Sequence, residues 1–382
     1  SLSPTGVRAV AEAWGEIFTF PSDKGDLRDL TNSPAVADRD PAWSPDGKWI
    51  AYFSDEPGEY ELQIRDQNGF GKVKHVSLGT PPSYFYSPKW SPDSKKILFT
   101  DKRMNIWYVD VESTKLTKVD TDRYDTPFHA LNPAWSPDSK WIAYAKQLPS
   151  HLRAVYVYSL DQIKAWQVTD GMSDAMYPVF DKDGKNLYFT ASTDVGLSAG
   201  WLDMSSLDHP VTRAVYVAVL RKEDPSPLAP ESDEEKGADA SKDSSAKAQE
   251  KPADKSKDAK KDDKADKSDK KADDKKSDAK DDKKEEPVVV RIDVEDIGQR
   301  VLALPIPPKN YVGLTAGKAG TLFVAEGPQV IREQDQEDLH VTLHKFDLSK
   351  RKVDKFLDDL SDFSISADGN KLLYRKGEQW AI

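Results

Sequence analysis

Apolar and polar residues alternate in short runs along most of the chain, and tight-turn sequences separate the runs. Typical runs are residues 49–53, 60–65 and 105–111, in which Trp, Ile, Tyr, Phe and Val recur. A period of two together with β-branched and aromatic residues predicts β-strands. Ser-Pro-Asp-Gly sequences between runs predict turns, because Pro fixes φ, Asp caps the turn and Gly tolerates a positive φ. The pattern therefore predicts an all-β protein.

One turn-centred unit returns several times along the chain. The ten residues from Trp43, WSPDGKWIAY, recur as WSPDSKKILF from Trp90 and as WSPDSKWIAY from Trp135, and weaker copies begin at Phe180 and Ile365. With a degenerate copy at residues 314–324 and a copy cut at its front at residues 2–10, the repeats start near residues 2, 43, 90, 135, 180, 314 and 365. The first three complete intervals are 47, 45 and 45 residues.

Strand-rich repeats of this length predict the blades of a β-propeller. Each unit offers a short strand ending in Trp, a strand after the turn, and two further strands, such as residues 60–65 and 73–78. The recurring Trp or Phe is interpreted as a wedge between adjacent blades, because a single sheet leaves two apolar faces to cover. We predict one seven-bladed β-propeller of four-stranded antiparallel blades over residues 1–382. The first blade is expected to lack its innermost strand and the last blade its fourth strand.

Residues 231–286 have a different character. They are almost entirely Lys, Asp, Glu, Ala and Ser, with no aromatic and no β-branched residue. Such a stretch buries too little apolar surface to offset the entropy of ordering. We expect a disordered linker, or alternatively a docking tail, inside the blade that starts near residue 180. Residues 215–221 are predicted as the strand that enters this insertion and residues 288–293 as the strand that leaves it.

Composition narrows the classes of partner and site. The formal net charge of −11 disfavours nucleic acid and anionic membranes as main partners. No run approaches the 18 apolar residues of a membrane-spanning helix. The chain has no Cys, which excludes disulfides, zinc–thiolate sites and Cys nucleophiles. It begins at Ser1 and ends within a strand-like run at Ile382, so we expect a fragment of a longer protein.

A search for chemistry finds no catalytic constellation. Gly196-Leu197-Ser198-Ala199-Gly200 matches the G-x-S-x-G pattern, but a nucleophile elbow needs a strand before the serine and a helix after it, and a loop is predicted here. His340 and His344 lie four apart in a strand-like run rather than a helix, so they do not form a zinc-protease motif. We therefore assign no catalytic, cofactor-binding or metal-binding residue, expect no cofactor, and name no channel-lining residue. The six histidines, all interpreted as surface residues, are His75, His129, His151, His209, His340 and His344.

The strong repeats resemble the WD-type units of TolB-like propellers, a generic likeness that covers most of the chain. A more specific likeness runs from residue 2 to residue 66. It is carried by GEIFTFP at residues 15–21, DLTNSP at residues 29–34, RDPAWSPDGKWIAYFSDE at residues 39–56 and GEYEL at residues 58–62. In these stretches the chain resembles tricorn-type proteases.

The resemblance implies a place in a larger enzyme. Tricorn-type proteins are serine peptidases with a six-bladed propeller, a seven-bladed propeller, and a PDZ domain between two parts of a catalytic core. It implies that this chain is the non-catalytic seven-bladed propeller, which guides peptides through its axial channel. The implied partners are peptide substrates, the PDZ and catalytic domains of the same chain, and further copies in a homo-oligomer, in the cytoplasm. The family's catalytic Ser and His lie downstream, so no residue here inherits their role.

Two alternatives stay open from the residues alone. A TolB-like propeller would dock partner proteins and have no enzymatic parent, which would suit a periplasmic location. The propeller of a prolyl-oligopeptidase-like enzyme would be accompanied by an α/β-hydrolase domain. A PDZ-like segment in the parent gene would favour the tricorn-type interpretation, and a true nucleophile elbow would favour the last one.

Overall fold

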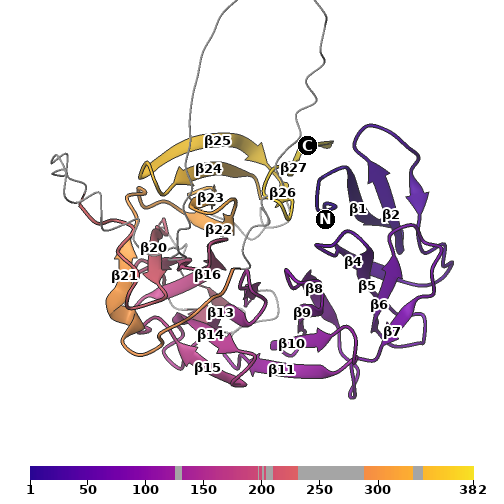
Figure 1. Ribbon diagram of the computed structural model, residues 1–382, viewed down its shortest axis with the longest axis horizontal. Coiled ribbons are helices and arrows are strands. Elements are labelled where there is room, and N and C mark those ends of the chain that lie inside the picture. The colour runs from indigo at the N-terminus through magenta and orange to yellow at the C-terminus, as the bar shows by residue number, and fades with distance from the viewer. Residues whose placement is uncertain (125–130, 197, 200–201, 204–209, 231–287, 330–338) are drawn as a thin grey trace, which may run out of the picture. The chain divides into compact units, whose positions relative to one another are not determined.

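Seven antiparallel sheets follow one another along the chain in the computed structural model (Figure 1). The structure describes residues 1–124, 131–196, 198–199, 202–203, 210–230, 288–329 and 339–382. Within each blade, the strands lie side by side in the same order in which they follow one another along the chain. Among the seven blade sheets, the first and last have three strands and the other five have four, which confirms the predicted seven-bladed β-propeller with shortened end blades. A further two-stranded sheet, formed by residues 198–199 and 202–203, lies in the loop between the second and third strands of blade 5.

The strands of the first three blades have the following bounds. Blade 1 holds β1 (Arg8–Ala13), β2 (Glu16–Pro21) and β3 (Arg28–Asp29). Blade 2 holds β4 (Asp38–Trp43), β5 (Trp49–Ser54), β6 (Glu61–Asp66) and β7 (Lys74–Val76). Blade 3 holds β8 (Phe85–Trp90), β9 (Lys96–Asp101), β10 (Asn105–Asp110) and β11 (Leu116–Thr121).

The remaining four blades continue the same order. Blade 4 holds β12 (Ala134–Trp135), β13 (Trp141–Gln147), β14 (Arg153–Ser159) and β15 (Lys164–Gln167). Blade 5 holds β16 (Asp174–Phe180), β17 (Asn186–Ser192), β20 (Ala214–Val219) and β21 (Val301–Ala303). Blade 6 holds β22 (Tyr311–Ala316), β23 (Thr321–Glu326), β24 (Val341–Asp347) and β25 (Lys352–Leu360). Blade 7 holds β26 (Asp362–Ile365), β27 (Leu372–Lys376) and β28 (Gln379–Ala381).

The hydrophobic core lies between the blades. Six clusters of buried side chains separate the seven sheets, and each cluster joins two blades that are consecutive in sequence. Between blades 2 and 3, for example, the ring of Phe53 stacks on that of Phe85 at 5.6 Å and meets the edge of Phe99 at 5.7 Å. Both faces of an inner sheet are thereby covered, as the repeat pattern requires.

The recurring aromatic residue is the predicted wedge between blades. Trp43, Trp90 and Phe180 are all buried, and each belongs to the cluster that joins its own blade to the preceding one. Trp90 also donates its indole N–H to the carbonyl oxygen of Ala42 in blade 2, at 3.0 Å. Trp135 is only half-buried, although its indole N–H likewise reaches back one blade, to the carbonyl oxygen of Lys89.

The first and last blades lie side by side. Gly6 of the first blade adopts φ +68° and lies so close to the side chain of Lys371 that a Cβ at this position would be 2.9 Å from the Lys371 Cγ. Ser1 and Leu2 run beside β1, because the Ser1 ammonium donates to the carbonyl oxygen of Val10 at 2.9 Å and Leu2 bridges to Ala9. These two residues occupy the start of the innermost position that the blade otherwise lacks.

The fifth blade corrects one prediction. Residues 288–293 are not a strand, and the fourth strand of this blade is β21, which pairs with β20 after the short 3₁₀ helix η1 (Ile297–Arg300). The apolar residues of the segment are used differently, since Val288 and Val290 pack on the turn at Gly184. The predicted disordered stretch, residues 231–286, lies outside the described residues.

Candidate functional site

The Ser-Pro-Asp-Gly turns share one hydrogen-bond pattern. In the turn of blade 2, the hydroxyl of Ser44 donates to Asp46 Oδ1 at 2.6 Å and accepts the amide N–H of Trp49 at 2.9 Å. The Asp46 carboxylate also accepts the amide of Lys48 at 3.1 Å. The equivalent serines of blades 3, 4 and 7 make the same pair of bonds, and they are Ser91, Ser136 and Ser366. Each of these repeats therefore closes its first hairpin by the same local chemistry.

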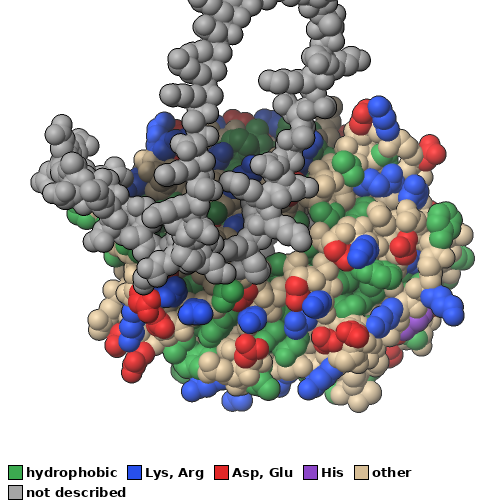
Figure 2. Space-filling view, viewed as in Figure 1, with side chains coloured by type: hydrophobic (Ala, Val, Ile, Leu, Met, Phe, Trp, Pro, Cys, Tyr) green, Lys and Arg blue, Asp and Glu red, His purple; other side chains and the backbone are tan. Residues whose placement is uncertain are grey.

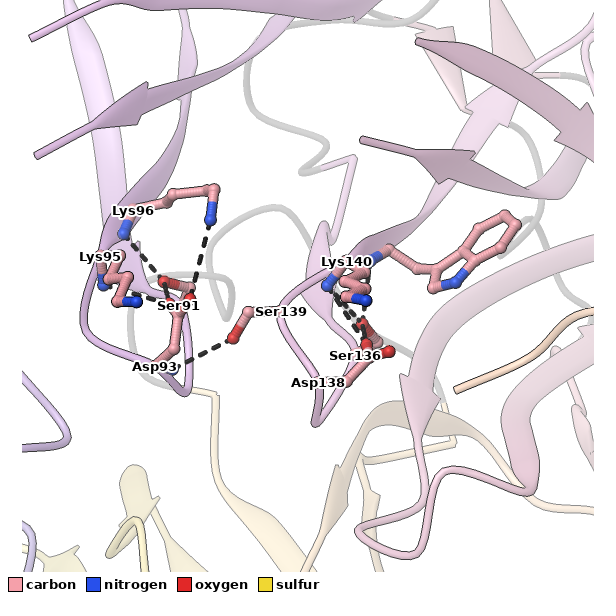
Figure 3. A network of polar contacts seen from close by, with 9 residues as sticks. Ser91, Asp93, Lys95, Lys96, Ser136, Asp138, Ser139 and Lys140 are labelled. Carbon is pink, nitrogen blue, oxygen red and sulfur yellow. Dashed lines mark hydrogen bonds and ion pairs between the residues drawn. The ribbon is translucent and has the colours of Figure 1, made fainter. Parts of the chain in front are cut away.

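Neighbouring turns are also linked to one another. The amide of Asp46 donates to Ser94 Oγ in blade 3 at 3.0 Å, and the amide of Asp93 donates to Ser139 Oγ in blade 4 at 3.1 Å. The second of these links is drawn in Figure 3, where Ser139 points across to the adjacent turn. Since the turns touch one another in succession, they lie on the same side of the ring and surround its axis.

A cavity of about 600 Å³ opens where the turns meet. Six of the seven blades contribute to its wall, which places it on the axis of the ring, and we call it the axial mouth. The lining residues are Pro4, Thr5, Pro45, Lys89, Trp90, Pro92, Pro133, Ala134, Trp135, Lys182, Ala367 and Asp368.

Two features of the repeat place these residues at the axial mouth. The second residue of the turn lines the mouth in five blades, as Pro4, Pro45, Pro92, Lys182 and Ala367. The position of Pro in the Ser-Pro-Asp-Gly unit is thus a sequence signal for the mouth. The sequence alone identifies this Pro only as part of a turn and names no channel-lining residue.

A second sequence signal for the mouth is a proline in the innermost strand of a blade, because the residue before it adopts a positive φ. Asp40, Ser87 and Tyr177 each precede Pro and adopt φ of +54°, +51° and +56°, and the strand register shifts at each of them. Asn132 precedes Pro133 with φ +47°. A bulge of this kind inserts unpaired residues and turns side chains away from the sheet. The bulge occurs in blades 2, 3 and 5, and the residue before Pro133 in blade 4 adopts the same backbone conformation next to the axial mouth.

The residues singled out in the sequence do not gather into a site. Ser198 lies in β18 (Ser198–Ala199), which pairs with β19 (Leu202–Asp203) in a hairpin whose strands are two residues long. The chain therefore returns as a strand after the serine, whereas a nucleophile elbow needs a helix there. Leu197 and Gly200 lie outside the described residues.

The described histidines are also scattered. His75 and His340 are exposed, as predicted, whereas His151 and His344 are half-buried. The ring of His344 lies 2.6 Å from Glu326 Oε2, because β24 runs beside β23. The two histidines outside the described residues are His129 and His209. In the part of the chain that the structure describes, no three His, Asp or Glu side chains are placed to hold a metal ion.

The charged groups of the surface are mixed. On the face seen in Figure 2, basic and acidic side chains alternate and do not form one continuous basic field. Among the described residues, no helix is long and apolar enough to cross a bilayer. The axial mouth is the candidate binding site that the described residues form.

The comparisons with known proteins agree with this architecture. Residues 1–382 match the family model described as the tricorn protease second beta propeller domain. The chain is 22% identical over 315 residues to a tricorn protease homolog of Saccharolobus solfataricus, covering 82% of this chain and 24% of that protein. It is 21% identical over 373 residues to tricorn protease homolog 1 of Streptomyces coelicolor, covering 91% of this chain and 30% of that protein.

A solved structure extends the likeness to the fold. The crystal structure of the tricorn protease superposes with a TM-score of 0.68 at 18% sequence identity, over 97% of this chain and 31% of that one. The chain thus spans about a quarter to a third of the length of the curated tricorn relatives it matches. With the family model matched from end to end and seven blades in the structure, the chain belongs to the family of tricorn protease second β-propeller domains.

Proposed function

We propose that this chain is the non-catalytic propeller of a tricorn-like serine peptidase and guides extended peptides through its axial channel towards an active site elsewhere in that enzyme. The observation that carries the proposal is the axial mouth, a cavity of about 600 Å³ walled by six blades. That volume falls within the 300–1,000 Å³ range of small-ligand pockets, so it suits a few residues of an unfolded chain and is too small for a folded domain.

The wall of the mouth suits a peptide as its ligand. Prolines and two indoles supply an apolar surface, while Thr5, Asp368 and two lysines supply polar groups. Both indole N–H groups are already bonded to backbone carbonyls of the preceding blade, so their rings act as fixed walls. A largely preformed apolar pocket with few polar groups is a common design for ligand sites. We further propose that the PDZ and catalytic domains of the parent protein and other copies of it surround this propeller, in the cytoplasm.

Blocking the mouth is expected to weaken peptide binding. Thr5 is an exposed turn residue on the mouth's wall, so Thr5→Trp adds a large side chain there without disturbing a core. A labelled unstructured peptide of about ten residues should bind the variant at least about tenfold more weakly, measured by fluorescence anisotropy. Val7→Trp is the matched control, because Val7 is 59% exposed and does not line the mouth. Equal binding by all three proteins would contradict the axial route.

The chain by itself is expected to hydrolyse no peptide bond. The reason is that the serine of its G-x-S-x-G sequence lies in a short β-hairpin, whereas a nucleophile elbow requires a helix after the serine. A fluorogenic peptide incubated with the purified chain should be cleaved no faster than in buffer. Turnover that persists through purification and disappears in Ser198→Ala would overturn the assignment of a non-catalytic role.

A further inference from the structure

We infer that the axial mouth recognises a carboxylate on the peptide, either the C-terminal carboxylate or an Asp or Glu side chain, through the ammonium groups of Lys89 and Lys182. This inference rests on the proposed peptide-guiding function and adds to it the chemical group that is selected. Both lysines line the same cavity, although they come from different blades.

Neither ammonium group is neutralised within the described residues. Lys89 lies in β8, and its Nζ donates one hydrogen bond, to the carbonyl oxygen of Pro133 at 3.1 Å. An ammonium has three donors, so two remain for a ligand. Lys182 holds the second position of its turn, and the described part of the chain gives it no hydrogen-bond or ion-pair partner. The mouth thus presents two cations from different parts of the repeat.

The carboxylate on the wall does not compensate them. Asp368 Oδ1 accepts Ser366 Oγ at 2.6 Å and the Asn370 amide at 2.9 Å, while its Oδ2 accepts the Asn370 side chain at 2.9 Å. The hydrogen bond from Ser366, followed by those from Asn370, lowers the pKa of Asp368 to about 2. Asp368 is therefore ionised but committed to its own turn, which leaves the mouth with an excess of one positive charge in a chain of net charge −11.

The surroundings of the lysines favour a counter-charge. Both lysine side chains are exposed at the mouth, and the protein around them lowers the pKa of Lys89 and the pKa of Lys182 by partial desolvation. No neighbouring carboxylate opposes the effect at either lysine among the described residues. Since no carboxylate pairs with either ammonium group among the described residues, each can form a charge-assisted hydrogen bond with an arriving carboxylate.

The geometry favours a peptide carboxylate over a nucleic acid. Nucleic-acid binding depends on many lysine and arginine contacts to successive phosphates, and the mouth holds only two lysines among its described lining residues. A peptide end or acidic side chain needs only one or two donors and can lay its apolar remainder against the prolines and indoles. The mouth matches that combination.

The test uses three labelled peptides of about ten residues and identical length with this 382-residue chain. The first is neutral with a free C-terminal carboxylate, the second is its C-terminal amide, and the third is the amide with one internal Gln replaced by Glu. Anisotropy titration should show that the first or the third peptide binds at least about tenfold more tightly than the second, a factor that corresponds to about 1.4 kcal/mol. The stronger of the two identifies the source of the carboxylate.

The lysine variants tie this preference to the mouth. The double variant Lys89→Gln, Lys182→Gln should bind all three peptides with the affinity of the neutral amide, within about twofold. Lys185→Gln, in the same turn as Lys182 but outside the mouth, should keep the full preference. An unchanged circular dichroism spectrum and melting temperature would show that the double variant is folded. If the double variant does not fold, the single variants Lys89→Gln and Lys182→Gln are compared with the unmodified chain in the same way.

The outcomes separate the two levels of the proposal. Equal binding of all three peptides by the unmodified chain, or a preference that survives both lysine substitutions, would overturn carboxylate recognition and leave the peptide channel standing. Absence of binding for every peptide would overturn the proposed function itself.

Discussion

Replacing Phe53 by alanine is expected to lower the free energy of unfolding by about 3–5 kcal/mol, the cost of removing a fully buried aromatic ring. The Phe53 side chain in β5 is completely buried, and its ring lies 5.6 Å from that of Phe85 and 5.7 Å from that of Phe99. Both partners belong to the next blade, so the cavity would open at an interface between blades. Urea unfolding followed by tryptophan fluorescence measures the effect.

The matched control is Phe70→Ala, because Phe70 is 92% exposed. Its substitution should change the free energy of unfolding by less than about 0.5 kcal/mol, as expected for an isolated surface side chain. In a repeat protein the contacts between neighbouring units supply much of the stability. If Phe53→Ala cost no more than Phe70→Ala, the view that the blades depend on a shared core would be wrong.

Asp174→Asn is expected to destabilise the chain by a similar amount, about 3–5 kcal/mol, because it removes the negative partner of a buried ionic group. Asp174 Oδ2 lies 2.5 Å from Arg213 Nη2, and its Oδ1 lies 3.3 Å from Arg153 Nη1. The Arg153 amide also donates to Oδ1 at 2.9 Å. All three residues are buried, so the guanidinium charges cannot be rehydrated when the carboxylate is lost.

Asp358→Asn serves as the control with the same chemical change. Asp358 also faces two cations, Lys355 at 2.9 Å and Lys376 at 3.3 Å, but about half of its side chain is exposed. Water and salt screen such exposed pairs, so this substitution should leave the denaturant midpoint close to that of the unmodified chain. Denaturant midpoints of the two variants provide the comparison. Equal effects would show that burial does not determine the importance of these ion groups.

The repeat period and the turns follow from short stretches of the chain. The spacing of Trp43, Trp90 and Trp135 predicts the blade period, and the Ser-Pro-Asp-Gly units predict turns whose hydroxyl and carboxylate bonds recur in four blades. The bonds of each turn join residues within five positions of one another. They therefore form independently of how the blades pack.

The conformation of residues 288–293, which were expected to form a strand and do not, depends on contacts with a distant part of the chain. The segment is apolar and β-branched, so its composition resembles that of a strand. Val288 and Val290 instead pack on the turn at Gly184, and the amide of Val290 donates to Asp138 Oδ2 of blade 4 at 2.9 Å. Residues 301–303 take the strand position and pair with β20. The competing partner comes from another blade, about 150 residues earlier in the chain, and no local pattern contains that information.

Alternation of apolar and polar residues and turn chemistry are properties of short segments, so the sequence is sufficient to predict the all-β class, the number of blades and the Ser-Pro-Asp-Gly turns. The packing of the blades sets three features that the sequence does not show: which turn residues face the axis, that Lys89 and Lys182 line one cavity, and that Asp174 contacts two arginines from elsewhere in the chain. The physical reason is that these contacts join residues tens of positions apart. Their distances are set by how seven similar sheets pack around a common axis.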